Sequence, residues 1–242
     1  MRLQLRVSTV ATEIPWPSVL APGRGIAYDL LAEAAPALGS RLHDHGWGPH
    51  GMVPIGYSAP LFPLARRRRG VYAAGGPGVV EFGSPLPEVV EAWARTLTGR
   101  KVIDWGGVAL RLEEIILVEP PEFDSGSARL RSQTPVVLKG SGKDLHGVRT
   151  TRQAWLLPGA PEFATYLENN LRRKAETVGV APDICLDEIT WVGPKRSFNV
   201  GGGNKPGAPI EVIVHGDPKV LQAIWSWGLG QANSAGFGWV IA

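Results

Sequence analysis

Residues 228–238 read Gly-Leu-Gly-Gln-Ala-Asn-Ser-Ala-Gly-Phe-Gly, so four glycines stand within one short segment. Glycines at this spacing let a backbone approach a ligand closely with its amides exposed, which suits a phosphate group. A dinucleotide-binding loop follows a strand and opens a helix, whereas this segment follows a predicted helix and leads into the last predicted strand. The order excludes that class of loop. Two interpretations stay open: a loop that contacts a ligand or shapes its surface, and a tight connection that returns the last strand to its sheet.

The elements before this glycine loop alternate in a βαββαβ order. A helix through Trp227 precedes the loop, since Asp217 and Pro218 supply an N-cap and a first-turn residue. An earlier helix is predicted from Phe163, Leu167 and Leu171, which share one helical face. Period-two patterns predict strands over residues 128–138, 184–192, 210–215 and 237–241.

The first half repeats this order, although the two halves show no visible sequence identity. Strands are predicted over residues 2–8, 52–58, 79–82 and 108–118, and helices over 26–35, continuing in a second piece to 43, and from Pro87 to Gly99. A Pro, Asp, Ser and Gly cluster at 120–126 is typical of a domain joint. The predicted fold class is therefore α+β, with two tandem ferredoxin-like (RRM-like, βαββαβ) domains over residues 1–123 and 124–242.

Composition narrows the class of protein. The hydrophobic share is 44% and no apolar run approaches the roughly 20 residues of a membrane helix. Leu3, Leu5 and Val7 alternate with polar residues, unlike the continuous apolar segment of a signal peptide, so we expect a cytoplasmic protein without membrane contact. Cys185 is the only cysteine, which excludes an intrachain disulfide and predicts a buried, inert thiol. The sequence pI of about 9.2 permits a polyanionic partner.

Several motifs together resemble one known family. The glycine loop has the spacing G-x-G-x5-G-F-G, and the segment from Glu162 to Lys174 ends in Asn-Leu-Arg-Arg-Lys. Weaker matches are Arg-Leu-His-Asp-His-Gly at 41–46, Gly-Tyr-Ser-Ala-Pro at 56–60 and Ser-Gln-Thr-Pro at 132–135. In this order they resemble the CRISPR repeat-processing endoribonucleases, the sixth family of CRISPR-associated proteins, which belong to the RAMP superfamily of tandem ferredoxin-like proteins. The resemblance covers nearly the whole chain and implies CRISPR repeat RNA as the partner.

The resemblance implies RNA cleavage without a metal or another cofactor. In this family the 2′-hydroxyl attacks the adjacent phosphate and leaves a 2′,3′-cyclic phosphate and a 5′-hydroxyl. His43 occupies the place of the family's catalytic histidine, and an imidazole can act as general base near neutral pH. Tyr28 resembles the accessory tyrosine, which could orient the ribose or stabilise the phosphorane. On one straight helix these residues would stand about 22 Å apart, so a shared site requires a chain reversal, which Pro36 and Gly39 permit.

One departure from the family concerns the proton donor to the leaving group. Many relatives carry a lysine shortly after the histidine, whereas this chain has Pro49 and His50 there. His50 is therefore a candidate catalytic residue, and His45 is an alternative. Two other interpretations of this stretch stay open: a metal site built from the His43, Asp44, His45 and His50 side chains, since imidazole is a common ligand, and a polar turn that contacts only solvent.

Basic residues predict the RNA-binding surfaces. Arg129 and Arg131 alternate on one face of a predicted strand. Members of the family often carry a basic residue inside the glycine loop, but Gln231 and Ala232 stand there in this chain, so phosphate contact would fall on amides or on Asn233 and Ser234. The run at 66–69 is a solvated loop or a further phosphate contact. The full predicted set is Arg129, Arg131, Lys139, Arg149, Arg152, Lys195, Arg196, Gly228, Gly230, Asn233, Ser234, Gly236 and Gly238.

Two alternative functions use the same features. A noncatalytic RAMP subunit that holds guide RNA in an effector complex would need the same fold, basic faces and glycine loop. A nucleotide-binding enzyme would use the glycine loop alone. The resemblance also leaves open other CRISPR effector subunits and a second copy of this chain, in a homodimer, as partners.

Overall fold

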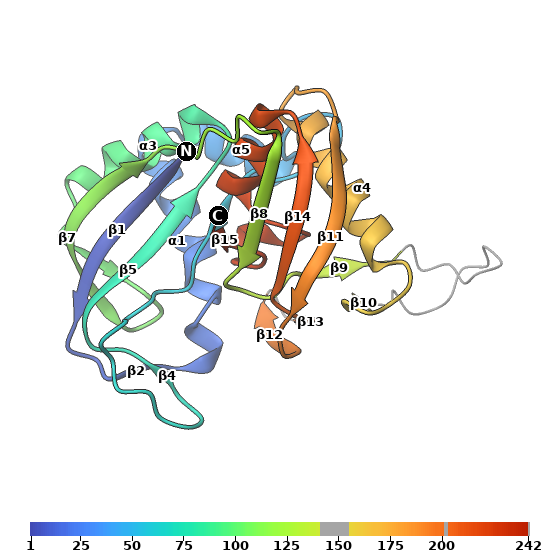
Figure 1. Ribbon diagram of the computed structural model, residues 1–242. Helices are drawn as coiled ribbons and strands as arrows, with labels where there is room; N and C mark the ends of the chain where they lie inside the picture. The colour runs from blue at the N-terminus through green and yellow to red at the C-terminus, as the bar shows by residue number, and fades with distance from the viewer. Residues whose placement is uncertain (141–154, 201–202, 242) are drawn as a thin grey trace.

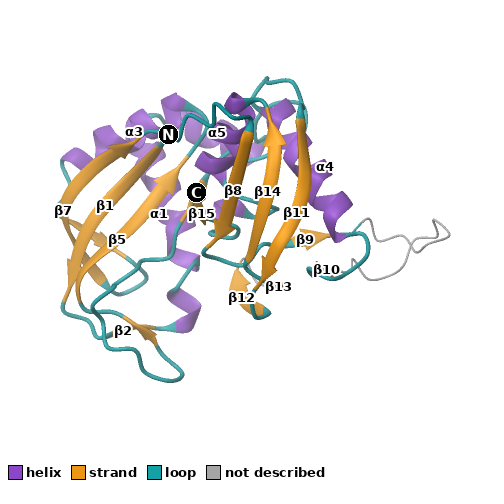
Figure 2. Ribbon diagram, viewed as in Figure 1, coloured by secondary structure: helices purple, strands orange, loops and turns teal. Residues whose placement is uncertain are grey.

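The computed structural model describes residues 1–140, 155–200 and 203–241. Its two large antiparallel sheets lie side by side, with the long helices behind them (Figure 1). Figure 2 shows in the same view that the strands of both sheets face the viewer and the helices cover their far side. Within these described residues, no helix is both long enough and apolar enough to cross a membrane.

The first sheet has the strand order β3-β5-β1-β7-β6. Its central strand β1 (Arg2–Thr9) buries Leu3, Leu5 and Val7 on the helix side, as the alternation predicts. α1 (Ala21–Ala34) and α3 (Pro87–Thr98) cover that side, and α2 (Pro36–Asp44) follows α1 directly. The other strands are β3 (Gly56–Tyr57), β5 (Gly76–Gly83), β6 (Val102–Asp104) and β7 (Ala109–Val118).

The second sheet has the order β11-β14-β8-β15, which is the same split βαβ topology. Its strands are β8 (Ser127–Ser132), β11 (Ile184–Val192), β14 (Ile210–Gly216) and β15 (Val240–Ile241), and its helices are α4 (Phe163–Thr177) and α5 (Pro218–Trp227). The Asp217 side chain accepts a 2.7 Å hydrogen bond from the Lys219 amide and so caps α5, as predicted.

Both sheets confirm the predicted α+β fold class with two tandem ferredoxin-like units. The proposed boundary at residues 123 and 124 lies between the last long strand of the first sheet and the first strand of the second. That the halves are separate domains with this boundary stays a prediction. Side chains of the two halves share a hydrophobic core. Val137, Val200, Ala235 and Phe237 of the second half pack into the core of the first half.

Several predicted elements differ in extent from those in the structure, and the structure also contains strands that were not predicted. The strand predicted over 128–138 ends at Ser132, because Thr134 and Pro135 leave the ladder and accept hydrogen bonds from the amides of Trp239 and Gly238. Because the amides of Gly238 and Trp239 make these contacts outside the ladder, the last strand begins only at Val240. Separately, the strand predicted over 52–58 is shorter and corresponds to β3. Pairs not predicted are β2 (Glu13–Ile14) with β4 (Tyr72–Ala73), β9 (Leu138–Lys139) with β10 (Trp155–Leu156), and β12 (Arg196–Val200) with β13 (Gly203–Gly207).

The prediction of a buried thiol is wrong. Cys185 is exposed on β11, opposite His215 of β14. Its neighbour Ile184 takes the buried position of that alternation, so the cysteine falls on the outer face of the sheet.

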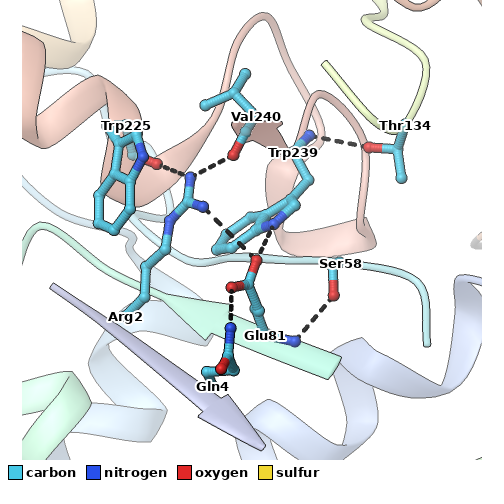
Figure 3. A network of polar contacts seen from close by, with 8 residues as sticks. All are labelled: Arg2, Gln4, Ser58, Glu81, Thr134, Trp225, Trp239 and Val240. Carbon is cyan, nitrogen blue, oxygen red and sulfur yellow. Dashed lines mark hydrogen bonds and ion pairs between the residues drawn. The ribbon is translucent and has the colours of Figure 1, made fainter. Parts of the chain in front are cut away.

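A buried arginine ties the two halves together (Figure 3). Arg2 of β1 is 2% exposed, and its Nη2 donates to the carbonyl oxygens of Trp225 and Val240, the latter at 2.7 Å. Its guanidinium lies between the rings of Trp225 and Trp239, with Cζ 3.7 and 3.9 Å from their centroids. Burial lowers the pKa of Arg2 to about 9, against the opposing effect of Glu81, so the group keeps its charge at neutral pH.

Glu81 of β5 completes this network. Its carboxylate lies 3.7 Å from Arg2 Nη1, and it accepts hydrogen bonds from Trp239 Nε1 at 2.9 Å and Gln4 Nε2 at 3.2 Å. The charge pair is therefore buried but also hydrogen-bonded, which is the condition under which ion pairs persist inside proteins.

We expect Arg2→Met to lower the free energy of unfolding by about 3–5 kcal/mol, since it leaves the Glu81 carboxylate and two buried carbonyls without their partner. Urea denaturation followed by tryptophan fluorescence measures this. The matched control is Arg6→Met on the same strand, whose exposed ion pair with Glu114 should contribute less than about 1 kcal/mol. Equal losses in the two variants would show that the buried network does not hold the halves together.

Candidate functional site

Tyr28 and His43 meet although fifteen residues separate them in the sequence. α1 ends at Ala34, Ala35 takes φ −151° and ψ 64°, and Pro36 opens α2 (Pro36–Asp44), so the chain reverses there. The two rings pack edge to face with centroids 5.3 Å apart and an interplanar angle of 80°. The reversal on which a shared site depends is confirmed, while the catalytic roles of both residues stay predictions.

The surroundings of His43 favour one tautomer. Its Nδ1 lies 3.0 Å from Asp44 Oδ1, and both side chains are 60% exposed. A proton on Nδ1 donated to this carboxylate leaves Nε2 with a free lone pair. Such an imidazole can accept a proton from a ligand hydroxyl.

Tyr28 offers a protonated hydroxyl beside that imidazole. Burial, as the main cause, raises the pKa of Tyr28, so the hydroxyl keeps its proton at neutral pH. Its oxygen is buried and has no hydrogen-bond partner among the described residues. Both side chains line a cavity of about 280 Å³, together with Gly39 and Ser40 of α2. The arrangement places one proton acceptor and one unsatisfied donor at a single cavity.

Arg24 is a site residue that the sequence prediction missed. It lies one turn before Tyr28 on α1, with Cζ 5.6 Å from the Tyr28 ring centroid. The predicted helix begins at Ile26 and so leaves Arg24 outside it, whereas α1 begins at Ala21 and Pro22 is one of its first-turn residues. With the helix start in place, the i, i+4 spacing of Arg24 and Tyr28 would have revealed the pair.

Further cations lie near Arg24. Burial and, to a smaller extent, the charges of Lys139 and Arg24 lower the pKa of Lys205 on β13. Lys205 Nζ also donates to the Val200 carbonyl at 2.7 Å. The charges of Arg24 on α1 and Lys139 on β9 therefore reach Lys205 on β13, and such mutual influence among cations favours an anionic ligand.

His50 lies in another environment. It belongs to the loop between α2 and β3, and its Nε2 is 2.5 Å from Glu176 Oε2 near the end of α4. The histidines of this stretch therefore separate, with His43 beside Asp44 and His50 beside Glu176. Across the described ranges, no three His, Cys, Asp or Glu side chains converge as a metal site would require. The catalytic role predicted for His50 stays a prediction.

The glycine loop is mostly buried. Gly228, Gly230, Gly236 and Gly238 are all inaccessible, and the amides of Leu229, Gln231, Gly236 and Gly238 donate to backbone carbonyls inside the fold. Gly236 has φ 83° and Gly238 φ 68°, and a Cβ on either would overlap the Tyr57 ring or the Leu229 carbonyl. The RNA contact predicted for these four glycines stays a prediction. Their burial favours the alternative interpretation, in which the loop shapes the surface and does not touch the ligand itself.

Asn233 and Lys174 fasten the loop from inside. Lys174 of α4 is fully buried, and its Nζ donates to Gly228 O at 2.5 Å and to Asn233 Oδ1 at 2.7 Å. Asn233 Nδ2 donates to the carbonyls of Leu229 and Phe237, both at 2.9 Å. The side-chain polar atoms of Asn233 are therefore engaged within the fold, and its predicted RNA contact stays a prediction. The neighbouring Ser234 is partly exposed and stays a candidate for RNA contact.

The predicted basic face of the second sheet is present. Arg129 and Arg131 are exposed on β8, and both lie against Glu211, at 2.9 and 3.7 Å. Arg131 also stacks on Trp191, with Cζ 4.3 Å from the ring centroid. A hydrogen bond from Thr190, followed by the two arginines, lowers the pKa of Glu211. One carboxylate therefore offsets part of the positive charge on this face.

The remaining predicted RNA-binding residues fall into two groups. Lys139, Lys195 and Arg196 are exposed, and Arg196 opens the β12–β13 hairpin. Arg149 and Arg152 lie outside the described residues, and their predicted RNA contact stays a prediction.

Comparisons with known proteins agree with this architecture. The family model "CRISPR associated protein Cas6, C-terminal" matches residues 118–241. The "CRISPR-associated endoribonuclease Cas6 1" of Methanocaldococcus jannaschii is 25% identical over 248 residues, spanning 100% of this chain and 92% of the relative. A solved "CRISPR associated protein Cas6" has a TM-score of 0.76 at 21% identity, over 100% of this chain and 98% of that one. "An RAMP protein binding different RNA substrates" has a TM-score of 0.78 at 15% identity, over 99% and 98%.

The buried Lys174 predicts a pH dependence of stability. Burial lowers the pKa of Lys174 well below its ordinary value, which is about 10.4 in an unfolded chain. Between these values the unfolded state binds the additional proton, so stability rises with pH up to about 10.4 and falls as the pH is lowered toward the folded-state pKa.

The measurement is the free energy of unfolding of the wild type and Lys174→Met between pH 7 and 10. As the pH rises, we expect the free energy of unfolding of the wild type to increase relative to that of Lys174→Met. The increase should be about 1.4 kcal/mol for each pH unit in which Lys174 is protonated only in the unfolded state. Lys219→Met, in an exposed first-turn position of α5, is the matched control and should show no such slope. A parallel pH profile for Lys174→Met and the wild type would contradict the lowered pKa of the buried amine.

Proposed function

This chain belongs to the Cas6 family of CRISPR-associated proteins, and from that premise we propose that it is an endoribonuclease that cleaves CRISPR repeat RNA into guide units. The observation that carries the proposal is the meeting of Tyr28 and His43 across the α1–α2 reversal. Of the relatives, the Methanocaldococcus jannaschii protein is named an endoribonuclease.

The proposed reaction is a transesterification within the RNA. His43 Nε2 accepts the proton of the 2′-hydroxyl, and that oxygen attacks the adjacent phosphorus. The bond to the 5′-oxygen breaks, which leaves a 2′,3′-cyclic phosphate and a 5′-hydroxyl. No metal ion takes part in this scheme. Asp44, hydrogen-bonded to Nδ1, holds the ring in the tautomer that this step needs.

Tyr28 and Arg24 would stabilise the charge that develops on the phosphorane. The Tyr28 hydroxyl has no partner among the described residues, so once the side chain turns to expose its buried oxygen, it can donate to a non-bridging oxygen without breaking another hydrogen bond. Arg24 lies one turn away on α1 and supplies a positive charge in a chain that lacks the family's lysine. His50 stays the predicted proton donor to the 5′-oxygen, and its ion pair with Glu176 must open for it to act.

The predicted RNA surface extends over the second half. Arg129, Arg131, Lys139, Arg196 and Ser234 are exposed or partly exposed, and contacts from them to phosphates would be sensitive to salt. Binding to other effector subunits or to a second copy of this chain stays a prediction.

We expect His43→Ala to lower the single-turnover cleavage rate of repeat RNA by about 10²- to 10⁴-fold, as for the loss of a general base, while the Kd changes only a few-fold. The matched control is His215→Ala, an exposed histidine of β14, which should cleave at the wild-type rate. The cleavage rate is measured with labelled RNA at saturating protein, and the Kd is measured by filter binding.

Two outcomes would contradict this assignment. An equal loss of binding in His43→Ala would make His43 a contact residue without a catalytic role. If the folded wild-type protein binds repeat RNA tightly but never cuts it, the noncatalytic RAMP subunit becomes the better account.

A 2′-deoxy nucleotide placed immediately 5′ of the scissile phosphate should abolish cleavage, because the nucleophile is missing. Affinity should change by about 1 kcal/mol or less, since one hydroxyl contributes little beside the phosphate contacts. Gel analysis of the matched ribose and deoxy substrates, each with and without EDTA, measures both properties. Cleavage of the deoxy substrate, or a rate that EDTA removes, would indicate an activated water and overturn the proposed nucleophile.

A further inference from the structure

An aromatic hollow lies away from the Tyr28–His43 cavity, where the η1 turn (Trp16–Ser18) contacts the β12–β13 hairpin. Figure 1 shows this hairpin beyond the ends of β11 and β14. Two adjoining cavities of about 430 and 270 Å³ share Trp16, Arg196 and Phe198 in their walls. We call them together the Trp16 pocket. They share no lining residue with the cavity of Tyr28 and His43.

The Trp16 ring is exposed and yet held in place. It is 40% exposed, and its Nε1 donates to the Gly70 carbonyl at 2.8 Å. The ring packs edge to face on Tyr72, with centroids 5.7 Å apart, and lies 6.3 Å from Phe198. An oriented aromatic face that remains open to solvent is a ready platform for stacking.

The charges around the pocket favour a phosphate-bearing ligand. Arg196 is exposed and lines both cavities, and its side chain makes no ion pair or hydrogen bond within the described part of the chain. No Asp or Glu is among the described residues that line either cavity. The arginine run at 66–69 leads directly into Gly70, which holds Trp16, and of that run Arg68 pairs with Glu13. The charge that an anion in the pocket would meet is therefore that of Arg196, which stands in the wall of both cavities.

Polar groups at the rim suit the edges of a nucleobase. Ser197, Asn199 and Asn204 line the larger cavity, and Gln133 and Thr134 line the smaller one. Amides and hydroxyls can donate and accept hydrogen bonds, as recognition of an unpaired base requires. A paired base would present neither its face nor its Watson–Crick edge to such a pocket.

We propose that the Trp16 pocket binds one unpaired nucleotide of the RNA substrate, with its base stacked on Trp16 and its phosphate at Arg196. This rests on the proposed function and adds a recognition site outside the scissile bond. The base stacks on the open face of Trp16 and not between Trp16 and Phe198. A base between two rings would need a stacking distance of about 3.5–4 Å on each side, and the Trp16 and Phe198 centroids are only 6.3 Å apart.

The test compares the Kd of fluorescently labelled repeat RNA among full-length variants. Trp16→Ala should weaken binding about 5- to 100-fold, as expected for loss of one stacked base, and Trp16→Phe should stay within about 3-fold of the wild type. Arg196→Ala should weaken binding and lower the salt slope by about one. Arg95→Ala, an exposed arginine in the last turn of α3, is the matched control and should bind like the wild type.

An abasic scan of the RNA identifies the nucleotide. At one unpaired position an abasic substitution should weaken binding to the wild type as much as Trp16→Ala does, and it should cause no further loss in Trp16→Ala. Additive losses at every position would overturn the proposal. If Trp16→Ala fails to fold, as thermal denaturation would show, Arg196→Ala and the scan of the wild type decide the question.

The outcomes separate this inference from the proposed function. A wild type that cleaves repeat RNA while Trp16→Ala and Arg196→Ala bind it equally well overturns the pocket alone, and would direct the search to a protein partner. A wild type that binds no repeat RNA overturns both.

Discussion

The buried guanidinium of Arg2 is the contact on which the arrangement of the two halves depends. It stands on the first strand of the chain and binds the carbonyls of Trp225 and Val240, which precede and follow the glycine loop. A buried charge is costly unless it is paired and hydrogen-bonded, and here Glu81 and two tryptophan rings meet that requirement. Because Arg2 binds both ends of the loop, it fixes the loop against the first sheet as well as joining the sheets.

The glycine loop transmits this arrangement to the candidate site. A Cβ at Gly236 would overlap the Tyr57 ring, so the loop lies directly on that side chain. Tyr57 in turn donates a 2.8 Å hydrogen bond to the Leu20 carbonyl, immediately before α1. α1 carries Arg24 and Tyr28, so a glycine pattern near the end of the chain helps to place residues near its beginning. Its strict spacing is explained by close packing, with Lys174 and Asn233 fastening it from the other side.

The sequence predicted the main strands and helices and their order along the chain, because alternating and helical apolar patterns record which side of each element is buried. It missed Arg24 because the predicted helix begins at Ile26, although a proline such as Pro22 is well tolerated in the first turn of a helix. Lys174 follows Leu171 by three residues and so falls on the buried face of α4, but a lysine there suggests solvent. The Trp16 pocket could not be predicted, since it joins η1 to a hairpin far away in sequence. For Tyr28 and His43, the sequence showed that they can share a site only if the chain reverses between them. It did not show that the chain does reverse there.

The exposure of the His43–Asp44 pair constrains how the proposed reaction can work. Both side chains are 60% exposed, and in water the electrostatic effect of one charge on another is weak. The free protein therefore has only part of the environment that stabilises a phosphorane. The bound RNA itself must cover the cavity and exclude water, and contacts remote from the scissile bond must hold it there. Under the proposed function, the basic face of β8 and the Trp16 pocket provide such contacts at places distinct from the chemistry. Selectivity for one phosphate among many would then arise from where the RNA is held, because His43 can act only on the ribose that those contacts bring to it.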